Sequence, residues 1–177
     1  MSQKIINIVD NGALSLLVKA DQLDLLFAGD RKVVITATVL AEATDDPTRP
    51  NVIKLQEWYD RNLASGNIIS GVETLKPADH VTYNPNGKTG QNGDISIMKY
   101  LDYNSNDNVI YNIVSNDNDL LDFRGIITKN GQHTGHIYKG TFYTNSPYEL
   151  IAELTLDKKI DSSTYIRCLV PEISGMG

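Results

Sequence analysis

Cysteine is almost absent from this chain of 177 residues, since Cys168 is its single copy. One cysteine cannot form an intramolecular disulfide, and it excludes a cysteine-based zinc site of the usual spacing. No stretch of the sequence approaches the roughly 20 apolar residues of a membrane-spanning helix. The N-terminus also lacks a basic segment followed by an apolar stretch and a small-residue cleavage site. We therefore expect a cytoplasmic protein with no membrane association and no export signal.

Positive charge is also in deficit. The net charge is -6 and the isoelectric point is near 5.0, which argues against the broad basic surface of a typical protein that binds duplex nucleic acid. A local basic rim is compatible with this total. The chain has 41% hydrophobic and 21% charged residues, a globular composition, and its length is that of one domain. We expect residues 1–177 to form a single domain.

Short β-branched runs alternate with segments of helical periodicity over much of the chain. Such alternation indicates an α/β domain with a mainly parallel sheet, in which ligands bind beyond the carboxyl ends of the strands. Strands are expected at 4–9, 32–35, 67–72 and 109–114, and helices at 13–26, from Thr36 or Thr38 as cap through Glu42, at 47–64 and at 93–103.

The pattern changes in the last third of the chain. An antiparallel hairpin is expected at 125–144, with its second strand at 136–144, because Asn130-Gly131 is a hairpin turn signal. Ser146-Pro147-Tyr148-Glu149 has the sequence of a capped helix start, so a helix to about Leu156 follows. A closing strand is expected near the C-terminus, at 164–170.

Acidic residues stand where apolar runs end or helices begin. Asp10 follows the first strand, Glu42 lies on an early helix and Asp94 opens a later one, while Asp117 and Asp119 follow the strand at 109–114. Carboxylates from separate segments supply the oxygen ligands that Mg2+ prefers, and Mn2+ accepts the same ligands. The sequence therefore predicts a Mg2+ or Mn2+ site formed by these acids.

Each acid also has a purely structural explanation. Asp10 suits the turn Asp-Asn-Gly, and Asp94 suits the positive end of a helix dipole. Glu42 can be a solvated helix residue, and Asp117 or Asp119 can cap the turn that follows. For any motif taken alone, both interpretations stay open.

Taken in order, the motifs resemble those of PIN-domain nucleases over roughly residues 5–156. The four acidic positions of that family match Asp10, Glu42, Asp94 and Asp117, with Asp119 as a second candidate for the last. The segment TFYTNSPYELIAEL looks like the last strand and helix of the family. The resemblance implies a three-layer domain with a central, mainly parallel sheet flanked by helices. Its core would span about 4–156, with the hairpin as an insertion and 157–177 as an extension.

The same resemblance implies a function. It is that of a Mg2+- or Mn2+-dependent endoribonuclease, a toxin neutralised by a cognate antitoxin or immunity protein and commonly a homodimer. Asp10, Asp94 and Asp117 or Asp119 would hold the metal, and Glu42 would complete the cluster or orient the attacking water. The alternative is a non-catalytic module on a PIN-like scaffold that binds protein or RNA. Gly12, where the family often has Asn or Ser, slightly favours that alternative.

Overall fold

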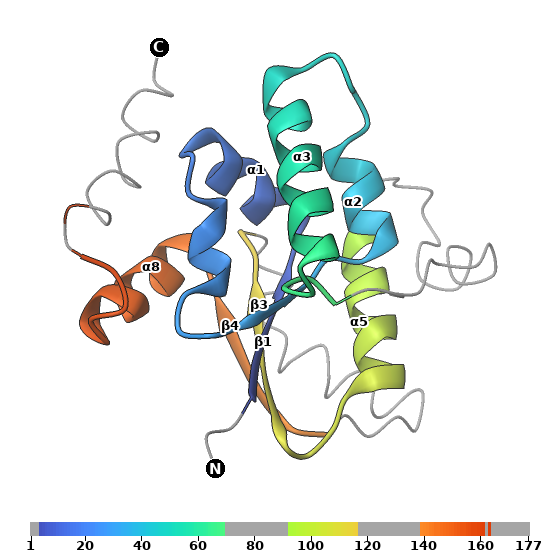
Figure 1. Cartoon of the computed structure of the whole chain (residues 1–177). Helices are drawn as coiled ribbons and strands as arrows, with labels where there is room; N and C mark the ends of the chain where they lie inside the picture. The colour runs from blue at the N-terminus through green and yellow to red at the C-terminus, as the bar shows by residue number, and fades with distance from the viewer. Residues whose placement is uncertain (1–3, 70–91, 117–138, 162, 164–177) are drawn as a thin grey trace.

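A parallel sheet lies at the centre of the fold. The computed structural model describes residues 4–69, 92–116, 139–161 and 163 (Figure 1). Its strands lie in the order β2-β1-β3-β4, and every neighbouring pair is parallel. The strands are β1 (Lys4–Val9), β2 (Lys32–Val34), β3 (Val109–Val114) and β4 (Thr141–Asn145). The α/β class and the mainly parallel sheet predicted from the sequence are thus confirmed.

The expected strand at 67–72 is only partly described. A parallel bridge joins Ile68 to Val33 of β2, so this run lies on the far side of β2 from β1. The residues after Ile69 lie outside the described part of the chain. From β1 the chain therefore builds outward in one direction, first with β2 and then with residues 67–69. It then returns to the other side of β1 to form β3.

Apolar, mostly β-branched residues explain why β1 and β3 occupy the middle of the sheet. Four consecutive residues are buried at the end of each strand, Ile6–Val9 and Tyr111–Val114. Because successive side chains point to opposite faces, both faces of the sheet must be covered there. The register aligns the two buried runs, with Val9 opposite Val114. The carboxyl ends of β1 and β3 therefore lie side by side within the core.

Helices cover the sheet. In the view of Figure 1, α8 lies to the left of the strands and α5 to the right. Among the described residues, none of the helices has the length and apolar character needed to cross a bilayer. The helices are α1 (Asn11–Lys19), the 3-10 helix η1 (Leu23–Phe27), α2 (Ala37–Ala43), α3 (Pro50–Ala64), α5 (Asn92–Asn104) and α8 (Pro147–Leu156).

The helix expected at 13–26 is wrong in its second half. It ends at Lys19, where the amide of Gln22 donates to the carbonyl of Leu17 and that of Asp21 donates to Val18. These bonds, with Asp21 at a φ of 56°, form the turn that usually ends a helix at glycine. Because aspartate, not glycine, stands at this position, the end of the helix has no clear signal in the sequence.

The helix expected at 47–64 begins three residues later, at Pro50. Asp46 explains the delay, since its carboxylate accepts hydrogen bonds from both the amide and the hydroxyl of Thr48. This local turn competes with helix formation before Pro50. Two other predictions are confirmed: Thr36, not Thr38, caps α2, and Ser146 forms a capping box with Glu149 at the start of α8.

The expected antiparallel hairpin requires a correction. The described part of its second strand, β4, pairs with β3 in parallel, with Ile110 opposite Thr141 and Val114 opposite Asn145. The residues of β4 alternate between exposed and half-buried, a pattern that does not distinguish the two strand directions. The first hairpin strand and the closing strand at 164–170 lie outside the described residues.

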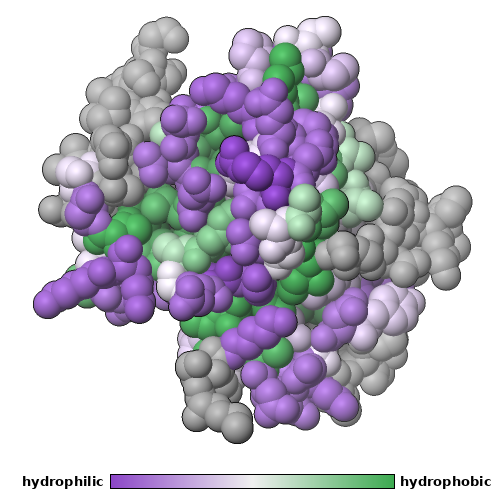
Figure 2. Space-filling view, viewed as in Figure 1, coloured by the Kyte–Doolittle hydropathy of each residue, from purple (hydrophilic) through white to green (hydrophobic). Residues whose placement is uncertain are grey.

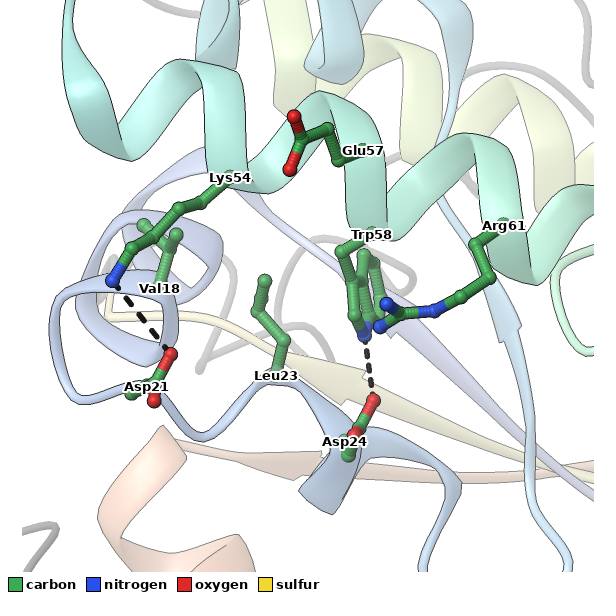
Figure 3. Close-up of a pocket in the computed structure, with 8 residues that line it drawn as sticks. All are labelled: Val18, Asp21, Leu23, Asp24, Lys54, Glu57, Trp58 and Arg61. Carbon is green, nitrogen blue, oxygen red and sulfur yellow. Dashed lines mark hydrogen bonds and ion pairs between the residues drawn. The ribbon is translucent and has the colours of Figure 1, made fainter.

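Two polar contacts join α3 to η1 and to the turn that precedes it, around a cavity of about 300 Å³ (Figure 3). The indole Nε1 of Trp58 donates to Asp24 at 2.8 Å, and the ammonium of Lys54 lies 3.8 Å from the carboxylate of Asp21. The Trp58 ring also stacks on Phe27 with centroids 5.3 Å apart. These contacts hold α3 in place. Over the face shown in Figure 2, hydrophilic residues alternate with smaller apolar areas.

Candidate acidic site at the carboxyl end of the sheet

Asp10 is the first residue after β1 and the N-cap of α1. Its backbone amide donates to the carbonyl of Val114, which extends the β1–β3 pairing by one bond. Its carboxylate accepts hydrogen bonds from the amides of Asn11 at 2.6 Å and Gly12 at 3.3 Å, and from the Ser115 hydroxyl at 3.0 Å. With 9% of its surface exposed, Asp10 is held firmly between the ends of two strands.

This position is the point where the sheet order reverses. From β1 the chain continues to β2 on one side, whereas from β3 it continues to β4 on the other. In open parallel sheets, ligands bind in the crevice beyond the strand ends at such a point. Asp10 and Ser115 lie at this point, followed by the exposed Asn116. The prediction that Asp10 stands at a ligand-binding edge thus has a geometric basis.

Glu42 approaches Asp10 from α2. Its half-buried carboxylate accepts a hydrogen bond from the backbone of Gly93. Burial raises the pKa of Glu42, the negative charge of Asp10 raises it further, and the Gly93 hydrogen bond acts in the opposite direction. Asp10 and Glu42, which come from separate segments, are therefore near enough for their charges to interact.

A pair of buried hydroxyls fixes the start of α5 against the start of α2. Thr36 Oγ1 and Ser96 Oγ are 2.5 Å apart, and the Ser96 hydroxyl also lies 2.6 Å from the carbonyl oxygen of Gly93, which it donates to. Thr36 in turn accepts the amide of Val39. This contact brings the first turn of α5, which contains the half-buried Asp94, next to Glu42. Neither hydroxyl was identified from the sequence as part of the site.

The described residues include only part of the predicted acidic cluster. Asp117 and Asp119 lie outside the described residues, and within the described ranges no three or more His, Cys, Asp or Glu side chains are grouped closely enough to hold a metal ion. The chemistry of the Asp10–Glu42 pair nevertheless fits Mg2+, which one or two carboxylates usually bind together with water and substrate phosphates. Burial is the larger cause of the raised pKa of Glu42, and the smaller cause, repulsion from Asp10, is what a cation would relieve.

A groove of about 590 Å³ lies beside Glu42, between α1 and the start of α3. Its wall carries two cations, Lys19 and Arg49, two acids, Glu42 and Asp45, and amide side chains. Arg49 pairs with Asp46 at 2.9 Å, but both groups are exposed and such a pair contributes little to stability. These cations can therefore turn to an anionic ligand. Sequence reasoning missed them, because nothing in the sequence indicates that the end of α1 and the start of α3 share one groove.

Comparisons of the chain with protein-family models, with curated proteins and with solved structures find no match. The structure itself defines the class: an α/β protein with a parallel sheet and a pair of acidic residues near the point where the strand order reverses.

Proposed function

We propose that this protein is a metal-dependent ribonuclease of the PIN-like type, which hydrolyses RNA phosphodiesters at the acidic site with Mg2+ or Mn2+. The observation that supports it most is the meeting of Asp10 and Glu42 at the reversal point of the sheet, with the pKa of Glu42 raised by burial and by the charge of Asp10. Like charges placed together in a partly buried site are unfavourable without a cation. A divalent ion gives this arrangement a physical reason.

The residues have separate roles in the proposed reaction. Asp10, Asp94 and Asp117 or Asp119 would hold the metal, which supplies an activated water and neutralises charge on the leaving oxygen. Glu42, oriented by the Gly93 amide, would complete the cluster or hold the attacking water as its proton acceptor.

Two further groups prepare the site. Ser115, with the amides of Asn11 and Gly12, keeps the Asp10 oxygens in a fixed position. Lys19 and Arg49 would hold phosphates of the RNA strand along the groove.

An inhibitor belongs to this proposal. A potent toxin of this type would be held in check by a cognate antitoxin or immunity protein, and the PIN-like toxins that the sequence resembles are commonly homodimers. The competing function is a non-catalytic binding module. It is favoured by one observation, that the described residues bring two carboxylates together but do not form a cluster of three or more.

The decisive experiment compares cleavage of a fluorescent single-stranded RNA in Mn2+ and in EDTA. Wild type should cleave only with Mn2+, and Asp10→Asn should lose at least about 100-fold in rate, which is typical when a group that stabilises charge in the transition state is removed. Asp21→Asn is the matched control, because Asp21 is an exposed aspartate beyond the opposite end of α1. Mn2+ should also raise the melting temperature of wild type. If Mn2+ neither activates cleavage nor changes that temperature, only the binding module remains.

A further inference from the structure

A second cavity, of about 340 Å³, opens on the face of the sheet next to α8. Its apolar part is formed by Ile5 of β1 and Ile110 of β3, and Tyr143 of β4 forms one side. Ile5, at the apolar end of the pocket, lies about 17 Å before Asp10 along β1. The polar end is nearer to the acidic site, because the carbonyl of Asn145 accepts the amide of Ser115, whose hydroxyl donates to Asp10. None of the residues that line this pocket also lines the groove beside Glu42.

The sheet register explains why these residues share one pocket. Ile5 is opposite Ile110, and Asn112 is opposite Tyr143. Because side chains alternate between faces, Ile110 and Asn112 project from the same face of β3, as Tyr143 and Asn145 do from β4. The result is an apolar floor bordered by amide side chains and one aromatic ring.

Hydrogen bonds fix the amides that border the pocket. Asn145 donates to Asn112 Oδ1 at 3.0 Å, Asn112 donates to Asn7 Oδ1 at 2.8 Å, and Asn7 donates to the Leu26 carbonyl at 2.7 Å. Asn145 also donates to Glu153 Oε2 at 3.0 Å. A network of this kind holds its members in one orientation. The pocket thus has a rigid polar border.

Arg31 completes the polar end of the pocket. It is 6% exposed, and its Nη2 donates to Glu153 Oε1 at 2.5 Å. Glu153 Oε2 is occupied by Asn145, so the carboxylate meets Arg31 with one oxygen only. Within the described residues, Nε of Arg31 consequently has no hydrogen-bond partner although it is buried. Such a donor is unusual in a folded protein and marks a place where a ligand or a rearranged carboxylate would complete the bonding.

The charges at this end argue against an ionic ligand. Arg31 and Glu153 neutralise one another, so the pocket offers hydrogen-bond donors and acceptors without a net charge to attract a phosphate. An uncharged molecule with both kinds of group is the better match. Its apolar body would rest on Ile5 and Ile110, as is usual in small-molecule sites.

We propose that this pocket binds a nucleobase. The base would turn its hydrogen-bonding edge toward the unpartnered Nε of Arg31 and the carboxylate of Glu153. Its ring would lie against Tyr143, which is 52% exposed and therefore has a free surface. Aromatic side chains bind single-stranded nucleic acid by stacking in this way, and carboxylate and amide side chains read base edges. The source of the base, an RNA strand that also reaches the acidic site, rests on the proposed ribonuclease function.

The test measures binding of the four ribonucleosides to the whole protein by equilibrium dialysis in EDTA. Wild type should bind at least one of them, and Tyr143→Ala should weaken that binding about tenfold or more, since stacking on one aromatic ring is lost. Tyr143→Phe keeps the ring and should keep the affinity. Tyr103→Ala is the control, because Tyr103 is 70% exposed on α5 and does not line the pocket. Circular dichroism checks that each variant is folded.

A second measurement identifies the source of the base. For a base within RNA, Tyr143→Ala should raise the KM for RNA cleavage and leave kcat unchanged, whereas an effect on nucleoside binding alone would assign the same pocket to free nucleosides. The proposal is overturned if wild type binds no nucleoside and Tyr143→Ala binds RNA as wild type does. Dialysis in EDTA requires no cleavage, so an inactive protein that still binds nucleosides would refute the ribonuclease proposal alone.

Discussion

Replacing Gly93 with alanine should separate activity from stability. Gly93 lies at the start of α5, and a Cβ atom there would be 2.9 Å from Oε2 of Glu42, whereas ordinary contact begins at 3.4 Å. The carboxylate oxygen must therefore move by about 0.5 Å, away from the amide that orients it. Val39 Cγ2, at 3.3 Å, leaves the methyl group little room to shift in the other direction.

The expected magnitudes differ for the two properties. Alanine in place of glycine in a helix stabilises it by about 0.5–1 kcal/mol, while the lost hydrogen bond to Glu42 costs about 0.5–1.5 kcal/mol. The free energy of unfolding should therefore change by less than about 1 kcal/mol. Displacing a reacting group by a fraction of an ångström to one ångström can reduce the rate up to about 100-fold. We expect RNA cleavage by Gly93→Ala to fall about 10- to 100-fold.

Gly12→Ala is the matched control. Gly12 also lies in the first turn of a helix beside a candidate acid, but its Cβ would meet Asp10 Oδ2 at 3.4 Å and Asn116 at 3.7 Å, both ordinary contacts. It should gain stability and keep the wild-type rate. Urea denaturation gives the stabilities, and Mn2+-dependent cleavage at equal folded concentration gives the rates. Equal rates for Gly93→Ala and wild type would refute the role of Glu42, and unfolding of Gly93→Ala would refute the stability estimate.

Three further predictions concern the same site. Asp10→Asn should lower the pKa of Glu42, because burial and the charge of Asp10 both raise this pKa and the variant removes the second of these causes. The pKa is measured by carbon-detected NMR titration, and an unchanged value would mean that the two carboxylates are far apart. Since the folded protein holds the Glu42 proton more tightly than the unfolded chain does, the stability that this group contributes is full at low pH and is lost as pH rises through the raised pKa. Glu42→Gln should remove that loss in urea denaturation between about pH 4 and about pH 7 in EDTA. Thr36→Val and Ser146→Ala each remove an N-cap, at a cost of about 1 kcal/mol. Thr36→Val also loses the buried hydrogen bond to Ser96, so it should cost a further 0.5–1.5 kcal/mol, roughly. Only Thr36→Val should reduce the cleavage rate per folded molecule.

Local chemistry made parts of the fold predictable. The strands at 4–9 and 109–114 were predicted with the bounds that the structure gives them, because each is a short run rich in β-branched residues that is ended by turn residues. The start of α8 was predicted from its capping box, in which Ser146 and Glu149 supply the bonds locally. The errors arose where tertiary pairing or an unusual turn decides, as in the parallel pairing of β4 and the stop of α1 at Asp21.

Of the residues that form the candidate site, only the acidic ones were predictable from the sequence. Asp10 and Glu42 were chosen from their place in the element order, and the structure brings their charges together. The groups that orient them were not predictable, since the Ser115 hydroxyl and the Thr36–Ser96 pair act across sheet and helix contacts that join distant segments. The pocket with the buried Arg31 depends on register between strands in the same way.

The N-cap role explains the oxygen at Asp10, and the dipole of α1 favours its charge, but neither explains why a second carboxylate, Glu42, lies near it. An N-cap needs only a side-chain acceptor, and asparagine or serine would cap α1 as well without repelling Glu42. Glu42 is harder still to explain, because it lies in the last turn of α2, where the helix dipole disfavours a negative charge, and it faces the charge of Asp10. A neutral residue at position 42 would avoid the repulsion from Asp10. The cation of the proposed function would offset this repulsion between the two carboxylates.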